Sequence, residues 1–188
     1  MPDYSLTLMV VRHCVLFAVL IISVYSDLVR GKIYNWCVLP GLFLGLLLNA
    51  LLGGFWAGHL SGANLGSSAL AILLVLIVFL WPYLKGGIAA GDVKLMLAVA
   101  GIGGLHNYFI LYALLYTAFI GALMALSVLI WRGRLRAGLK GTARFLFSAG
   151  PRSSEAEGEQ KTPPITVPYG LAISFGSILA WFIVEVPR

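Results

Sequence analysis

Six apolar segments separated by short polar stretches make up most of this 188-residue chain: residues 6–26, 34–52, 65–84, 93–103, 108–131 and 165–186. A helix that crosses a bilayer needs about 20 mostly apolar residues, and every segment except the fourth has about that length. The pattern therefore predicts an all-α fold, a polytopic membrane helix bundle with about six transmembrane helices. No internal repeat is evident.

The fourth segment, residues 93–103, is too short to cross a bilayer alone. Its eleven residues rise only about 16 Å against a hydrocarbon core of about 30 Å. It must borrow flanking residues, tilt, or lie where the bilayer is thinned. Within the first segment, a short apolar run follows Arg12 and His13 as in a signal peptide, but no A-x-A-like cleavage site follows, so we expect this helix to be retained.

Composition agrees with a membrane protein, since 60% of the residues are hydrophobic and only 11% are charged. Soluble domains carry roughly 25% charged residues. Cys14 and Cys37 form no CxxC motif, which excludes a zinc knuckle or a dithiol redox site. The three histidines, His13, His59 and His106, have no ligand spacing, so no metal site is expected.

The basic residues gather on one side of the predicted bundle. The loops after the first, third and fifth segments, with the residues beside them, hold eleven of the thirteen: Arg30, Lys32, Lys85, Lys94, Arg132, Arg134, Arg136, Lys140, Arg144, Arg152 and Lys161. The positive-inside rule makes this side cytoplasmic and places both termini outside, although Arg12 alone favours the opposite orientation. The net charge of +6 is explained by topology and anionic lipid headgroups, so no nucleic-acid partner is expected.

One sizeable polar stretch, residues 132–164, belongs to the predicted cytoplasmic side. Its first half, RGRLRAGLKGTARFLF, has the composition of an interfacial helix lying on anionic lipid. Its second half, PRSSEAEGEQKTPP, is typical of a flexible linker. A solvated connector without a role in chemistry explains the same stretch. We expect a single membrane domain, residues 1–188, that includes this loop.

Asp27 and Asp92 are the acids that adjoin apolar segments on the predicted cytoplasmic side. An ionisable group at the edge of a membrane segment is a functional-site hypothesis by default. Two carboxylates that share a proton can activate water, which is the chemistry of a protease within a membrane. Asp27 is expected at a helix C-terminus and Asp92 at a helix N-terminus, where the dipole favours a carboxylate. The hypothesis is that Asp92 has the lower pKa and acts as the base, while Asp27 holds the shared proton.

Structural explanations exist for each of these residues. Asp92 is a suitable N-cap, and Asp27 can pair with Arg30 or Lys32 in the following loop. Asn35 is a suitable N-cap for the second segment.

The residues on either side of Asp92 have structural explanations of their own. Lys94 diverges from Asp92 by about 200° on a helix, which suits a snorkelling anchor better than an ion pair. Gly91 belongs to a glycine-rich loop, which permits close backbone approach.

Three motifs resemble one known family. GGIAAGDVKLM, residues 86–96, resembles the GxGD signature of the type IV prepilin peptidases and archaeal preflagellin peptidases, with Ala89 replacing the first glycine. YSDLVRGKIYN, residues 25–35, is similar to the family's D-x5-I-x-N pattern, and a later PYG matches its P-[YF]-G. The matched positions are Asp27, Ile33 and Asn35 in the first of these two patterns, and Pro168, Tyr169 and Gly170 in the second.

The resemblance implies a GxGD-type membrane aspartyl protease with Asp27 and Asp92 as the catalytic pair and no cofactor. Family members remove a short basic leader from prepilin-like membrane proteins, after a glycine and at the cytoplasmic face of the prokaryotic inner membrane. The small size and the lack of cysteine pairs resemble the short, tight-adherence pilus forms. Ala89 would strain the loop if that position needed a positive φ.

Other interpretations remain open at this stage. Both aspartates could bind protons or cations in a transport subunit, or the chain could be a non-catalytic pilus or secretion assembly protein. A presenilin-like protease would share the chemistry but cut within a substrate's membrane helix. The loop acids Glu155, Glu157 and Glu159 could attract the basic leader or could be ordinary linker residues.

Overall fold

A computed structural model describes residues 3–55, 63–131 and 169–185 of the chain. All regular structure in these residues is helical, which confirms the predicted all-α fold. The elements are α1 (Asp3–Arg30), α2 (Asn35–Gly53), α3 (Leu65–Leu84), α4 (Ala90–Gly103), the short 3-10 helix η1 (His106–Tyr108), α5 (Phe109–Trp131) and α7 (Tyr169–Glu185). The polar stretch 132–164 lies outside the described residues, as does Pro168.

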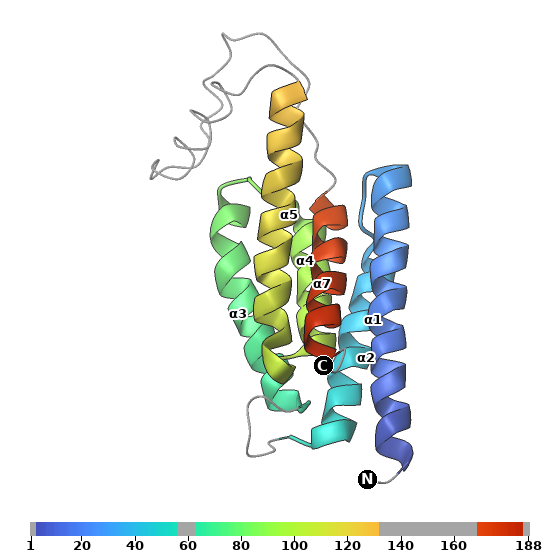
Figure 1. Ribbon diagram of the computed structural model, residues 1–188. Coiled ribbons are helices and arrows are strands. Elements are labelled where there is room, and N and C mark those ends of the chain that lie inside the picture. The colour runs from blue at the N-terminus through green and yellow to red at the C-terminus, as the bar shows by residue number, and fades with distance from the viewer. Residues whose placement is uncertain (1–2, 56–62, 132–168, 186–188) are drawn as a thin grey trace.

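Four of the described helices are long and apolar enough to cross a membrane: Leu6–Arg30, Asn35–Gly53, Leu65–Leu84 and His106–Trp131. The helices run side by side and alternate in direction (Figure 1). Their outer faces expose large apolar side chains such as Ile21, Phe43, Ile77 and Phe119, as a surface in contact with lipid does. The fold is therefore a helical membrane bundle.

The start of α1 and the end of α7 lie at the same end of the bundle (Figure 1). The other end brings together the end of α1 and the starts of α2, α4 and α7. Helix ends that share one end of a bundle face the same side of the membrane. This arrangement agrees with the prediction that both termini share a side, while the cytoplasmic orientation of the aspartate side stays a prediction.

The short fourth segment forms the centre of the bundle. Helix α4 has 14 residues, about 21 Å in length, and packs against α2 and α3 while also contacting α1, α5 and α7. Leu95, Met96 and Val99 are fully buried. Because neighbouring helices surround α4 on these sides, its length has to match the protein interior rather than the thickness of a bilayer.

A polar network inside the bundle anchors the C-terminal end of α4. Asn49 of α2 is fully buried, and its side-chain amide donates to the carbonyl oxygens of Gly101 and Ile102 at 3.0 and 2.9 Å. It also donates to Ser68 Oγ at 2.8 Å. These carbonyls carry the negative end of the α4 dipole, and each needs a donor when buried.

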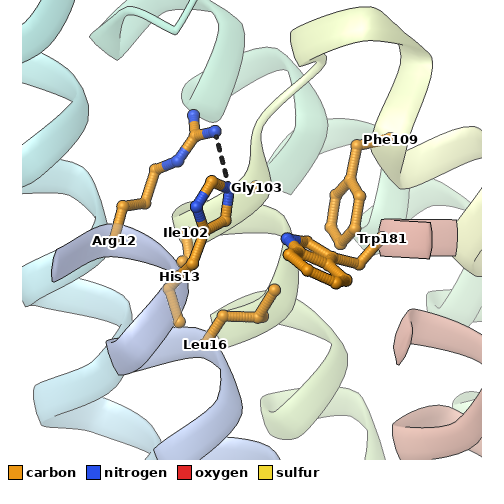
Figure 2. A pocket seen from close by; sticks show the side chains of 7 residues that line it. All are labelled: Arg12, His13, Leu16, Ile102, Gly103, Phe109 and Trp181. Carbon is orange, nitrogen blue, oxygen red and sulfur yellow. Dashed lines mark hydrogen bonds between the residues drawn. The ribbon is translucent and has the colours of Figure 1, made fainter. Parts of the chain in front are cut away.

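Arg12 belongs to this network and is only 2% exposed. Its guanidinium contacts Asn49 Oδ1 at 3.5 Å and His13 Nε2 at 3.4 Å. Arg12, His13 and Trp181 line a cavity of about 10 Å³, and Figure 2 shows His13 between Arg12 and Trp181. Because Arg12 is buried between helices and is not part of a loop, its position explains why its charge disagrees with the positive-inside pattern.

The helix boundaries differ from the prediction at both aspartates. Helix α1 continues past residue 26 to Arg30, so Asp27 lies in its last turn. Helix α4 begins at Ala90, three residues earlier than predicted, and Asp92 lies in its first turn. The N-cap position is taken by Ala89, which rules out the interpretation of Asp92 as the N-cap.

Candidate functional site

The three sequence motifs converge at one end of the bundle. Asp27 is in the last turn of α1, Asp92 in the first turn of α4, and Gly170 is the second residue of α7. The negative charge of Asp27 disfavours the ionised form of Asp92, and the Asp27 carboxyl group lies against the backbone of Gly170. The fold thus brings together carboxylates that are 65 positions apart in the sequence.

Asp92 is the more deeply buried of the two aspartates, with 8% of its surface exposed. It lies at the start of α4, outside the four membrane spans. Burial and then the nearby charge of Asp27 raise the pKa of Asp92 from 3.8 to about 6, against a smaller lowering by the backbone N–H of Ala89. The sequence hypothesis of a low pKa at this helix N-terminus is therefore wrong, because loss of solvation outweighs the helix dipole.

We expect Asp92→Asn to make the protein more stable above pH 6. The pKa of Asp92 is higher in the folded state than in the unfolded state. Its contribution to the free energy of folding is therefore fully present below pH 3.8 and is lost as pH rises through about 6. The difference between the two pKa values corresponds to at most about 3 kcal/mol in the free energy of unfolding. Thermal unfolding in detergent at pH 4 and pH 8 should show matching midpoints at pH 4 and a higher midpoint for Asp92→Asn at pH 8. Equal pH dependence of the two proteins would contradict the assigned pKa.

Asp27 is partly buried in a tight contact with α7. A Cβ atom added at Gly170 would lie 2.7 Å from Asp27 Oδ2 and 3.2 Å from Asp27 Cγ. The backbone N–H of Gly170 also acts on the carboxylate. Among the described residues, Asp27 Oδ2 is buried and has no hydrogen-bond partner. A buried acceptor of this kind is suited to bind a water molecule or a substrate donor.

The contact predicts a specific effect of Gly170→Ala. The new methyl group would displace the Asp27 carboxyl group, a side-chain end that can rotate, without displacing backbone. Misplacing a catalytic group by about 1 Å can cost about 100-fold in rate. We therefore expect a loss of about that size in catalytic rate with nearly unchanged thermal stability. Unchanged activity would show that Asp27 need not occupy this position.

Ile33 and Asn35 connect the loop after α1 to the same site. A Cβ added at Gly91 would lie 3.2 Å from Ile33 Cβ, and one added at Gly170 would lie 3.2 Å from Ile33 Cδ1. Lys94 Nζ donates to Asn35 Oδ1 at 3.0 Å. The residue at the N-cap of α2 is Tyr34, so the interpretation of Asn35 as an N-cap is wrong. Lys94 of α4 is therefore hydrogen-bonded to α2. Its interpretation as a snorkelling anchor did not include this contact.

The sequence model of the type IV leader peptidase family matches residues 14–126, more than half of the chain. The chain belongs to this family. No curated protein matched it, and neither did any solved structure. The matched range contains Asp27, Asp92 and the residues that connect them, whereas Tyr169 and Gly170 lie beyond it. Membership makes the protein a peptidase, and its four apolar spans make it a membrane peptidase.

In this leader peptidase, Ala89 replaces the first glycine of the expected motif without strain. Its φ of −75° and ψ of 148° are extended values that an L-residue adopts freely. The positive φ of this loop occurs at Gly86, at 68°. The predicted effect of Ala89 on the loop is therefore not found, since this position does not need a left-handed conformation.

Tyr169 lies at the candidate site, but its ring faces α5. A Cβ added at Gly121 would lie 3.0 Å from Tyr169 Cε2, and the charge of Asp92 acts on the Tyr169 hydroxyl. Within the residues that the structure describes, no group of three or more His, Cys, Asp or Glu side chains could hold a metal ion. The sequence did not point to Asn49, although a lone amide in an apolar run is the signal that could have done so.

Proposed function

We propose that this protein is an aspartyl endopeptidase that removes the short basic leader from type IV prepilin-like membrane proteins. Asp27 and Asp92 activate the water that attacks the peptide bond. The proposal is supported above all by the convergence of the family motifs on one pair of carboxyl groups. Asp27 lies against Gly170, its charge acts on Asp92, and Ile33 contacts the glycines beside both aspartates.

The environments of the two carboxyl groups suggest their roles. With a pKa raised to about 6, Asp92 holds the shared proton. Asp27, which is less buried, serves as the base. It takes a proton from water as the oxygen adds to the carbonyl carbon, while Asp92 donates its proton to the carbonyl oxygen. As the C–N bond breaks, Asp27 passes its proton to the leaving amine and Asp92 regains one from the diol.

We further propose that this site faces the cytoplasm of a prokaryotic cell whose inner membrane contains the protein. The end of α1 and the loops at the aspartate end carry Arg30, Lys32 and Lys85, and positively charged segments of this kind remain on the cytoplasmic side. Because the aspartates lie at helix ends rather than at the bundle centre, they can meet a leader that approaches from water. A site for ions in transit would be expected near the middle of the membrane.

The test is cleavage of a prepilin-like substrate in membranes that contain this protein, followed by sequencing of the new N-terminus. A cut after the glycine that ends the basic leader supports the proposal. A cut inside the apolar segment would indicate an intramembrane protease of the presenilin kind. Absence of any cut by well-expressed protein, tested on several leader-bearing substrates, would overturn the function.

A further inference from the structure

An apolar groove runs between α1 and α7, and Leu28, the residue after Asp27, is among the residues that line it. It has a volume of about 340 Å³. The residues that form its walls near the aspartate include Val24, Tyr25 and Leu28 of α1, and Ser174, Phe175 and Ile178 of α7. Tyr25, Leu28 and Phe175 are each more than half exposed. The groove therefore opens toward the lipid that surrounds the bundle.

The groove shares helix faces with the contact that holds Asp27. Leu28 follows Asp27 directly, and Val24 lies one helical turn before it on the same helix. Ser174 lies one turn after Gly170, the residue whose backbone contacts the Asp27 carboxyl group. Residues one turn apart lie on the same helix face. A chain that enters the site at Asp27 can thus continue along the groove toward the middle of the membrane.

Ser174 is the small residue among those that line the groove. Its side chain is small, it is 1% exposed, and its hydroxyl has no hydrogen-bond partner among the described residues. Because the side chain is small, it leaves a hollow in the groove at this point, and small residues let two membrane helices approach closely. Ser174 is thus suited to the surface of a helix–helix contact.

We propose that this groove binds the apolar membrane helix of the leader-bearing substrate, the part that directly follows the cleaved bond. This inference rests on the proposed function. The cleaved bond must lie at the aspartates while the substrate's helix stays in the bilayer, and the groove joins those two places. Side chains of the substrate helix fill the hollow at Ser174, as ridges of one helix fill grooves of another.

A second hollow of about 210 Å³ provides the comparison. It lies between α3 and α5, where Phe79 and Pro82 of α3 and Thr117 and Ala118 of α5 form part of its wall together with Tyr169 of α7. None of its lining residues belongs to α1, the helix that carries Asp27. Binding of the substrate helix there is the alternative that the experiment must distinguish.

Photo-cross-linking tests the proposal directly. A photoreactive phenylalanine analogue placed at Tyr25 or Phe175, in an Asp92→Asn background that retains uncut substrate, should cross-link to the apolar segment of a prepilin-like protein. The same analogue at Phe119, an exposed position on α5 (61%), is the control, and position Ala118 reports the second hollow. Adducts only with lipid, equal yields at Phe119, or adducts only at Ala118 would each overturn the groove.

Filling the groove gives an independent readout in the active enzyme. Ser174→Leu should raise KM about ten-fold with little change in kcat, which is the signature of lost substrate binding. Ala118→Leu, which fills the second hollow, should leave both constants unchanged, and a KM increase in that variant instead would contradict the proposal. If the unsubstituted enzyme cuts its substrate but neither test detects the groove, only this inference fails. If it cuts no leader-bearing substrate, the proposed function fails too.

Discussion

Replacing either Asp27 or Asp92 by asparagine is expected to reduce the rate of leader cleavage by about 10⁴-fold or more. Acid–base catalysis by one positioned group contributes up to about that factor, and in the proposed mechanism the two groups act together. Asparagine keeps the shape of aspartate but neither accepts nor releases a proton at neutral pH. The measurement is the initial rate of substrate processing in membranes with matched enzyme levels.

Two controls separate loss of chemistry from loss of structure. Asp3→Asn changes an acid at the opposite end of α1 and should leave the rate unchanged. Asp92→Asn should unfold at a higher temperature than the unsubstituted protein at pH 8, so its inactivity cannot result from a destabilised fold. More than about a tenth of the original rate in either the Asp27→Asn or the Asp92→Asn variant would exclude a mechanism that needs both carboxyl groups.

The sequence predicted the helices well because long apolar runs have few alternatives in a membrane. Residues 65–84 were predicted with the bounds that the structure shows for α3, and the second segment differed from α2 by one residue at each end. The errors concentrate at Asp27 and Asp92, where helices continue into polar sequence. Hydrophobicity marks where lipid contact ends, whereas a helix ends where its backbone hydrogen bonds end.

The candidate site was only partly predictable. The motifs identified Asp27, Asp92 and Gly170, but not that Gly170 contacts Asp27 or that Ile33 lies against two glycines. Such contacts join segments far apart in sequence, and their close approach depends on the packing of the whole bundle. The raised pKa of Asp92 was also not predicted, because a helix dipole can be inferred from sequence position and burial cannot.

Helix α4 connects the polar network at one end of the bundle with the candidate site at the other. Its first turn holds Asp92, and its last carbonyls accept hydrogen bonds from Asn49. A short buried helix with both ends fixed cannot slide along its axis, so the position of Asp92 depends on contacts about 15 Å away along the helix. Substitutions near Arg12 and Asn49 should therefore affect stability first and activity through it.

Asn49→Leu is expected to destabilise the protein by about 2–4 kcal/mol, because it leaves two buried carbonyls of α4 without their donor and removes an acceptor from Arg12. Asn49→Asp keeps the acceptor for Arg12 but places a carboxylate oxygen against the carbonyl oxygens of Gly101 and Ile102, so a loss at least as large is expected. Thermal unfolding in detergent measures both, with Leu47→Ala at a lipid-facing position of α2 (55% exposed) as the control. If Asn49→Leu unfolded at the same temperature as the Leu47→Ala control, the network would not anchor α4. A buried carbonyl that loses its donor lowers the stability of the fold unless a water molecule replaces that donor.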